Sequence, residues 1–300
     1  MQTIRNVSDL NLFFHRNEKP IYFISATNFN LMGIDRWVRK FRYINYIDCF
    51  DGRHPNVFVP PKTPHDEFES IEDINNYLLQ HKAVIDYIER NGGDPAAVFL
   101  MFDEKTEELC KELNIDLWFP SAKLRTRCDN KMETVRIGNA AGVPSVPNAL
   151  EKVDSYEHLM QIAERNGLGN SLVVQTAFGD SGHTTFFISS REEFDKHADD
   201  IINDPEVKIM KRINCRGATL EAVATRSGTL VGPLLTEVVG ATELTPYKGG
   251  WCGNEVFAGA FTEEVRMKAR EMAMKFGDQL VHEGYRGYFD VDFLIDKDTN

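Results

Sequence analysis

Two acidic side chains near the end of the sequence have the spacing of a metal-binding pair. Apolar and acidic residues alternate in the run Phe289-Asp290-Val291-Asp292-Phe293. Because side chains on a β-strand alternate between two faces, the apolar residues would share one face and both carboxylates the other. Carboxylate oxygens on one face suit Mg²⁺, a hard cation that prefers oxygen ligands. Two solvated carboxylates on an edge strand would give the same pattern.

A glycine-containing loop between two apolar runs is the second candidate site. Residues 172–174 are apolar, Gly179, Ser181 and Gly182 follow, and residues 186–188 are apolar again. This order predicts strand, loop, strand. Glycines allow the backbone to approach a ligand closely, and converging N–H groups in such a loop can hold phosphate oxygens. An ordinary hairpin is the alternative, since so short a motif has little specificity by itself.

The composition is ordinary for a soluble globular protein. The chain has 300 residues, enough for two domains, of which 42% are hydrophobic and 27% charged. Its net charge of -12 argues against general binding to nucleic acid. No apolar stretch approaches the roughly 20 residues that span a bilayer, and residues 1–9 lack the apolar core of a signal peptide. The five scattered cysteines lack CxxC spacing, so we expect reduced thiols, no zinc site and a cytoplasmic protein.

Strands and helices alternate in the first part of the chain. This alternation predicts a parallel sheet covered by helices, an α/β domain that ends near residue 122. No G-x-G-x-x-G follows the first strand, which disfavours a nicotinamide oxidoreductase. Asp103 is expected to cap a helix, and residues 51–66 to form a loop. The expected strands are residues 20–25, 43–47, 98–102 and 117–119, and the expected helices are residues 71–90 and 104–113.

After residue 129 the pattern changes to hairpins with separate helices, which predicts an α+β domain. The helix over residues 262–283 has the clearest apolar stripe and a Thr262 cap. Residues 240–260 carry many glycines and polar groups and are expected to form a long functional loop. The other expected helices are residues 129–141, 155–166 and 192–202, and the expected strands are residues 207–213, 219–224, 230–239 and 287–296.

Four segments stand in the order found in the ATP-grasp superfamily. They are Lys131 opening a helix closed by Ala-Gly-Val-Pro at 141–144, the glycine-rich hairpin, Lys-Ile-Met-Lys-Arg-Ile at 208–213, and Gly-Tyr-Arg-Gly-Tyr-Phe-Asp-Val-Asp-Phe-Leu-Ile-Asp at 284–296. Together they resemble the biotin carboxylase-like, carboxylate–amine ligase branch over roughly residues 98–300. The resemblance implies a pre-ATP-grasp domain over 1–122 and an ATP-grasp domain over 123–300, with a lid at about 130–212 and an incomplete core at 213–300.

The resemblance implies that ATP and Mg²⁺ bind in the second domain. Lys131 would lie against the α- or β-phosphate, and residues 209–213 would form the hinge whose backbone reads the adenine edge. Asp292 matches the family's first metal-binding carboxylate, whereas Asp290 has no counterpart. The family has an acidic residue near Met210, so ribose recognition would differ here. The implied nucleotide-binding residues are Lys131, Gln175, Gly179, Ser181, Gly182, His183, Thr184, Met210, Lys211, Arg212 and Ile213.

The sequence departs from the family pattern in two places. Gln175 stands where the family has a second lysine, so either ATP affinity is reduced or a neighbour such as Lys211, Arg212 or His183 substitutes. In addition, the family continues past the position of Asn300 with a strand that carries a Glu-x-Asn metal pair and a substrate-binding Arg. We therefore expect the sequence to stop short of half of the metal site.

The loop over residues 240–255 is the best candidate for the acceptor-substrate region. It offers Glu243, Lys248 and Trp251 beside flexible glycines, and an ordinary surface loop is the alternative. Further candidates on the preceding strands are Glu221, Glu237 and Arg216, the last as an anion ligand. No nucleophile elbow is present, and no cysteine has a credible histidine partner.

These features favour an ATP-dependent ligase that activates a carboxylate as an acyl phosphate for attack by an amine. The expected partners are small-molecule carboxylate and amine substrates, with no nucleic acid or membrane, and a homodimer is one expectation. A biotin or bicarbonate carboxylase is a related alternative, although nothing in the sequence specifies biotin. A nucleotide-binding member without full catalytic activity is the alternative from another class, and Gln175 supports it.

Overall fold

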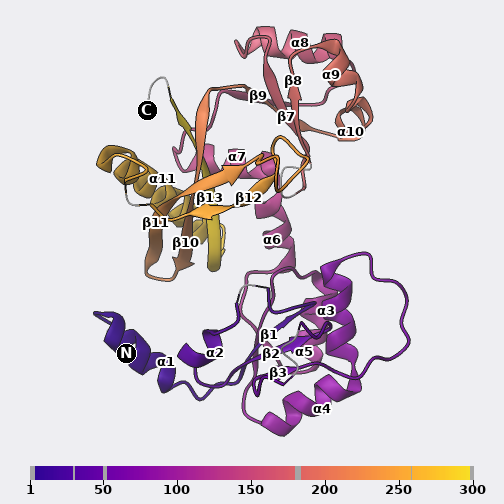
Figure 1. Ribbon diagram of the computed structural model, residues 1–300, viewed down its shortest axis with the longest axis vertical. Coiled ribbons are helices and arrows are strands. Elements are labelled where there is room, and N and C mark those ends of the chain that lie inside the picture. The colour runs from indigo at the N-terminus through magenta and orange to yellow at the C-terminus, as the bar shows by residue number, and fades with distance from the viewer. Residues whose placement is uncertain (1–3, 30, 50–52, 180–183, 258, 298–300) are drawn as a thin grey trace. The chain divides into compact units, whose positions relative to one another are not determined.

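The computed structural model describes residues 4–29, 31–49, 53–179, 184–257 and 259–297 (Figure 1). The predicted phosphate-binding residues Ser181, Gly182 and His183 therefore lie outside the described residues. The chain divides into two compact units, Met1–Lys123 and Leu124–Asn300, which are described separately. Within the described ranges, no helix has both the length and the apolar character needed to cross a membrane.

The first unit is built on a five-stranded parallel sheet with the strand order β3-β2-β1-β4-β5. All five residues of β1 are buried, because helices and loops cover both faces of the sheet. The predicted α/β unit is therefore confirmed. Its strands are β1 Ile21–Ser25, β2 Phe41–Asn45, β3 Val57–Phe58, β4 Ala96–Val98 and β5 Asp116–Leu117, and its helices are α1 Val7–His15, α2 Ile34–Trp37, α3 Ile71–Gln80, α4 Lys82–Asn91 and α5 Glu104–Glu112.

Some boundaries in the first unit differ from the prediction. The single helix over 71–90 is wrong, because His81 is extended at φ -74 and ψ 120 and its Nδ1 accepts a hydrogen bond from the Ala83 N–H, which starts a new helix. The strand expected over 98–102 ends at Val98, and the loop over 51–66 contains β3. The Asp103 cap is confirmed by a 2.8 Å hydrogen bond from the Thr106 N–H to Asp103 Oδ1.

Helix α6 Ala122–Asp129 begins just before the boundary at Lys123 and runs into the second unit. That unit continues with α7 Lys131–Ala140 and a small antiparallel sheet, the lid sheet, with the order β6-β9-β7-β8. The predicted strand-loop-strand at 172–188 is confirmed as β7 and β8. The helix expected over 192–202 is instead two short helices, α9 and α10. Figure 1 shows these and α8 beside the lid sheet. The bounds are β6 Asn148–Glu151, α8 Tyr156–Arg165, β7 Leu172–Gln175, β8 Thr185–Ile188, α9 Arg191–Asp195, α10 Ala198–Asn203 and β9 Val207–Lys211.

A second antiparallel sheet, the core sheet, has the order β12-β11-β10-β13. Helices α7 and α11 supply Ile137, Ala269 and Ala273 to the apolar cluster on one face of this sheet. The predicted antiparallel strands and the long helix are confirmed, whereas the expected loop over 240–260 contains an edge strand, β12. The bounds are β10 Cys215–Thr225, β11 Gly228–Val239, β12 Trp251–Glu255, α11 Glu263–His282 and β13 Gly287–Asp296.

Helix α11 packs on the core sheet so closely that Gly277 has no room for a side chain. A Cβ atom there would lie 2.5 Å from Thr229 Cγ2 and 2.8 Å from Phe289 Cζ. Gly138 in α7 is also helical and buried, but its nearest neighbour to such a Cβ would be the Val143 carbonyl oxygen at 3.7 Å. An alanine substitution at Gly277 therefore tests packing together with helix propensity, whereas the same substitution at Gly138 tests helix propensity alone.

We expect Gly277→Ala to lower the free energy of unfolding by about 1–3 kcal/mol, because overpacking outweighs the gain in helix propensity. Gly138→Ala is the matched control and should raise it by about 0.5–1 kcal/mol. Urea unfolding of both variants measures the difference. If Gly277→Ala were as stable as Gly138→Ala, the described packing of α11 on β11 and β13 would be wrong.

Candidate active site

One face of the lid sheet is turned away from α8, α9 and α10, and we call it the inner face. Leu172, Val174 and Ile209 pack into the lid core with the helices. Alternation along the strands therefore directs their sequence neighbours to the inner face. Gln175 lies directly opposite Lys208 on β9, and Val173 lies opposite Met210. On β7, β8 and β9 the inner-face residues are Val173, Gln175, Thr185, Phe187, Lys208 and Met210, and on β6 they are Asn148 and Leu150.

The loop after β7 is held at the head of helix α7. The Ala177 carbonyl accepts a hydrogen bond from the Lys131 N–H at 3.0 Å, and the Gly179 carbonyl accepts one from Lys131 Nζ at 2.5 Å. On its other side, the Ala177 N–H donates to Asp204 Oδ2 at 3.0 Å. Gly179 has φ +134, and a Cβ there would clash with Thr184, so only glycine fits. The structure thus brings Lys131, Gly179 and Thr184 together.

Lys131 occupies the first turn of α7 because Asn130 caps that helix. The Asn130 side chain accepts hydrogen bonds from the N–H groups of Met132 and Glu133. A lysine in the first turn opposes the helix dipole, so the position is unfavourable unless an anion or a carbonyl compensates. The Gly179 carbonyl provides that contact here.

Lys208 is a candidate that the sequence analysis missed. It is half-buried on the inner face, and burial, followed by the nearby Lys131 charge, lowers the pKa of its ammonium group. Within the described part of the chain, Lys208 has no hydrogen bond from its side chain and no ion pair. Period-two alternation over 207–211 could have indicated that Lys208 shares a face with Met210. Its position opposite Gln175 could not be read from the sequence.

The expected hinge residues do not all lie on the same face of the lid sheet. Met210 is buried on the inner face, and half-buried Ile213 follows the end of β9. Lys211 lies opposite Leu172, which puts it on the other face of the sheet, where it is exposed. The Lys211 and Arg212 N–H groups donate to the carbonyls of Pro147 and Ser171.

The aromatic ring of Phe187 on the inner face is contacted by two cations. The guanidinium carbon of Arg212 lies 5.4 Å from the ring centroid, and the Nζ atom of Lys248 lies 5.0 Å from it. Lys248 comes from the segment between β11 and β12, so this contact joins the core sheet to the lid sheet. Both side chains are therefore close to the inner face, but each is already engaged with an aromatic ring.

Four carboxylates share the face of the core sheet that is opposite α11. Asp290 lies opposite Glu221, and Asp292 lies opposite Thr219 in the β10–β13 register. Glu237 on β11 extends over Gly217, where a Cβ would come within 2.9 Å of Glu237 Oε2. The apolar residues Phe289, Val291 and Phe293 face the core, so the predicted alternation is confirmed. We call Glu221, Glu237, Asp290 and Asp292 the carboxylate face.

The electrostatics of the carboxylate face favour protons or cations. Burial, then Asp292 and Asp290, raises the pKa of Glu237 to about 7. Burial and the same two aspartates raise the pKa of Glu221, whose Oε2 is buried without a hydrogen-bond partner. Desolvation by the surrounding sheet is also the first cause of the raised pKa of Asp290 and Asp292, although both residues keep solvent-exposed surface. Among the described residues, no lysine, arginine or histidine forms an ion pair with these four groups.

The carboxylate face fits a metal ion held mainly by a nucleotide. No three His, Cys, Asp or Glu side chains converge as a metal site within the described ranges. Mg²⁺ at nucleotide sites commonly takes only one or two carboxylates and completes its shell with water and phosphate oxygens. Asp292 is exposed and has no cationic partner among the described side chains, so it can supply such a ligand.

The remaining predicted residues lie elsewhere. Arg216 is opposite Ile295, on the α11 side of the sheet, where its Nη1 donates to the Ala260 carbonyl at 2.8 Å and its guanidinium lies over Phe261. It is therefore separated from the carboxylate face by the sheet. Glu243 is exposed in the turn after β11. The structure does not bring Arg216 and Glu243 together with Glu237.

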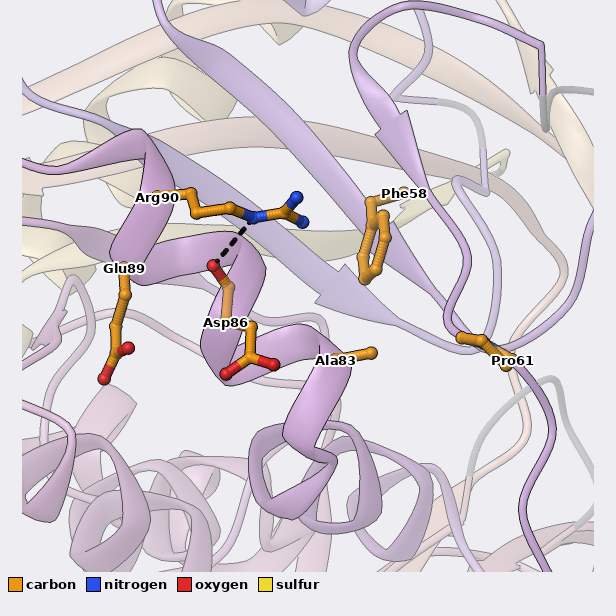
Figure 2. A pocket seen from close by; sticks show the side chains of 6 residues that line it. All are labelled: Phe58, Pro61, Ala83, Asp86, Glu89 and Arg90. Atoms are coloured by element: carbon orange, nitrogen blue, oxygen red, sulfur yellow. Dashed lines mark hydrogen bonds between the residues drawn. The ribbon is translucent and has the colours of Figure 1, made fainter.

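A separate pocket lies in the first unit beside α4 (Figure 2). Its polar groups are largely used within that helix, because Arg90 Nε donates to the Asp86 carbonyl at 3.1 Å and Lys82 pairs with the Asp86 carboxylate. No predicted site residue contributes to it. The lining residues are Phe58, Pro61, Ala83, Asp86, Glu89 and Arg90.

No protein-family model matches the sequence, and no curated protein matches it significantly. Solved structures do resemble it. Biotin carboxylase from Campylobacter jejuni in complex with β-γ-ATP has a TM-score of 0.70 and 17% identity, over 94% of this chain and 64% of that chain. An N5-carboxyaminoimidazole ribonucleotide synthetase in its ADP complex has a TM-score of 0.64 and 15% identity, over 93% and 67%. D-alanyl-alanine synthetase A from Vibrio cholerae has a TM-score of 0.54 and 12% identity, over 69% and 64%.

These similarities, together with the parallel sheet followed by two antiparallel sheets, define the fold. The chain has the ATP-grasp fold over most of its length. It spans about two thirds of the length of the solved structures it resembles. At this level of sequence identity, structural similarity establishes the fold but not the reaction, which depends on the residues of the site.

The raised pKa of Glu237 predicts how stability depends on pH. The folded state holds this proton more tightly than the unfolded state, so Glu237 destabilises the fold in full above about pH 7. The penalty shrinks as the pH falls below 7 and is gone only below the ordinary carboxyl pKa of 4.5. We therefore expect Glu237→Gln to melt higher than wild type at pH 8, with a smaller difference at pH 6 that vanishes only below about pH 4.5. Thermal melts at both pH values measure it.

Glu255→Gln on the exposed edge strand β12 is the control and should show no such difference. An equal melting-temperature difference between wild type and Glu237→Gln at pH 6 and pH 8 would contradict the placement of Glu237 beside the two aspartates.

Proposed function

We propose that this protein is an ATP-dependent ligase that converts a carboxylate into an acyl phosphate and transfers the acyl group to an amine. The observation that carries the proposal is the attachment of the β7–β8 loop to Lys131 at the head of α7. A glycine-rich loop beside a lysine has the chemistry of a phosphate site. The carboxylate face in the same unit supports a companion metal site, and the ATP-grasp fold supports both.

In this proposal the lid supplies the nucleotide site. Lys131 neutralises phosphate charge, Gln175 and Thr184 donate hydrogen bonds to phosphate oxygens, and Gly179 lets the backbone approach them. Ser181, Gly182 and His183 belong to the same proposed loop. Met210 packs against the adenine. The Lys211 and Arg212 N–H groups are engaged by Pro147 and Ser171, so the remaining backbone groups at 211–213 recognise the adenine edge. Asp292 holds Mg²⁺, which when bound shields the β- and γ-phosphates.

The reaction has two displacement steps. A carboxylate oxygen of the substrate attacks the γ-phosphorus, the bond to the bridging oxygen breaks, and ADP leaves. The amine then attacks the acyl carbon and phosphate leaves. Glu237 accepts the proton of the amine in this proposal, because a carboxylate whose pKa is about 7 can take up a proton near neutral pH. Lys248 and Glu243 border the proposed acceptor region, whereas Arg216 lies on the other face of the sheet and takes no part in it.

Two other functions are favoured by particular observations. Similarity to biotin carboxylase supports a carboxylase that activates bicarbonate. Gln175 supports a nucleotide-binding protein without turnover. ADP release separates the three: stimulation by a mixture of carboxylates and amino acids supports the ligase, stimulation by bicarbonate supports the carboxylase, and ATP binding without ADP release supports the third.

We also propose a homodimer. The 2-oxoglutarate carboxylase biotin carboxylase domain from Hydrogenobacter thermophilus, similar in structure with a TM-score of 0.66 and 13% identity, is a dimer. Val7, Phe13 and Trp37 leave large apolar side chains exposed on α1 and α2, which suits a covered surface. Sedimentation of the protein at several concentrations tests this proposal, and a monomer at all of them would contradict it.

Lys131→Ala should weaken ATP binding by about tenfold to a hundredfold, because it removes one charge-assisted contact to phosphate. Lys275→Ala, an exposed lysine of α11 paired with Glu271, is the control and should bind ATP as wild type does. Calorimetric titration measures both. Unchanged ATP affinity in Lys131→Ala, with a normal thermal melt, would mean that the nucleotide site is wrongly placed.

Asp292→Asn should retain most of the nucleotide affinity and lose turnover, because the metal ion would be misplaced in the transition state. ADP release and ATP titration on the same sample separate the two effects. Asp292 is exposed, so the variant should melt normally without ligand. Wild-type turnover in Asp292→Asn would remove this residue from the proposed metal site.

A further inference from the structure

We propose that Lys208 binds the phosphate groups of the nucleotide and provides the positive charge that Gln175 lacks. This inference rests on the proposed function and adds a residue to its nucleotide site. The sequence alone suggested Lys211, Arg212 or His183 as the substitute. Lys211 lies on the opposite face of the lid sheet, and Arg212 lies over Phe187. His183 lies outside the described residues.

The β7–β9 register puts Lys208 beside the position of the missing charge. Gln175 and Lys208 are directly opposite each other on adjacent antiparallel strands. Side chains in such pairs share a face, with Cβ atoms about 4.5–5.5 Å apart. Strand β7 lies between β9 and β8 in the sheet, and Gln175 Nε2 donates to Thr185 Oγ1 on β8 at 3.0 Å. The Gln175 side chain is thus drawn toward β8, which leaves the Lys208 ammonium group to contact a phosphate on the β9 side.

The charges around Lys208 indicate an anionic ligand. Lys131 is near enough to disfavour the charged form of Lys208. The neighbouring acids are engaged elsewhere, since Asp204 accepts from the Ala177 N–H and both carboxylate oxygens of Glu206 accept from Arg136 Nη2. The like charges of Lys131 and Lys208 raise the energy of the ligand-free fold when both groups are ionised. A polyphosphate placed between them removes that cost and makes charge-assisted hydrogen bonds.

A solvated lysine is the competing interpretation of Lys208. Lysine often packs its aliphatic stem against a protein and keeps its ammonium group in water, and such a residue contributes little to ligand binding. The two interpretations differ in what the ammonium charge does. If the ammonium charge binds phosphate, removing it weakens nucleotide binding, and placing a lysine on the opposite strand restores that binding. If Lys208 is only a solvated lysine, removing its charge leaves nucleotide binding unchanged.

The test uses three variants of the whole protein. Lys208→Gln removes the charge, Gln175→Lys combined with Lys208→Gln moves it across the strand pair, and Lys196→Gln removes an exposed lid lysine paired with Glu192. Each variant is titrated by calorimetry with MgATP and with inorganic tripolyphosphate, and each is melted without ligand.

We expect Lys208→Gln to bind both probes about tenfold to a hundredfold more weakly, the swapped double variant to bind within a few-fold of wild type, and Lys196→Gln to be unchanged. The melting temperature of Lys208→Gln should equal or exceed that of wild type, because a half-buried unpaired charge is lost.

Unchanged binding in Lys208→Gln would overturn the inference while leaving the proposed function standing. Weakened binding that the swap does not restore, together with a lowered melt, would also overturn it, since Lys208 would then act on the fold. Wild type that binds tripolyphosphate through Lys208 but does not bind MgATP would overturn the proposed function and support the anion site. Wild type that binds neither probe would overturn both.

Discussion

Two hydrogen bonds from Lys131, one from its backbone N–H to Ala177 and one from its Nζ to Gly179, attach the β7–β8 loop to the head of α7. Helix α7 also packs its other side into the core of the second antiparallel sheet through Ile137. A single helix therefore connects the glycine-rich loop of the lid sheet to the sheet that carries the carboxylate face. The Asn130 cap determines where α7 begins, and through it where the Lys131 charge lies. The proposed phosphate site depends on this arrangement.

Alternation along the strands separates structural from chemical side chains in both sheets. On β13, Phe289, Val291 and Phe293 stabilise the packing against α11, while the intervening aspartates are left to solvent on the other face. On β9, Val207 and Ile209 fill the lid core, while Lys208 and Met210 reach the inner face. Each sheet thereby keeps charged groups that weaken the ligand-free fold, since among the described residues no cation pairs with the four carboxylates and no acid pairs with Lys208. A metal ion and a polyphosphate would satisfy these groups together, the metal at the aspartates and the phosphates at the lysines.

Local signals in the sequence were sufficient for much of this fold. Caps at Asp103 and Thr262 and the stripe of α11 depend on neighbouring residues only, and the structure has them as predicted. Features that depend on pairing between strands far apart in the sequence could not be predicted from the sequence. Lys208 became a candidate only through its pairing with Gln175, and Arg216 was separated from Glu237 only by the β10–β13 register. Strand β12 resembled a loop because Gly250 and Gly253 flank or occupy it, and pairing with β11 is what makes it a strand.

The central claim is that a nucleotide polyphosphate lies between Lys131 and Lys208, with its metal ion at Asp292. A crystal structure of the protein with Mg²⁺ and a non-hydrolysable ATP analogue tests this most directly. The account predicts that both Nζ atoms lie about 2.7–3.0 Å from phosphate oxygens and that Asp292 is about 2.1 Å from Mg²⁺. A nucleotide bound elsewhere, or one whose phosphates contact neither lysine, would contradict it.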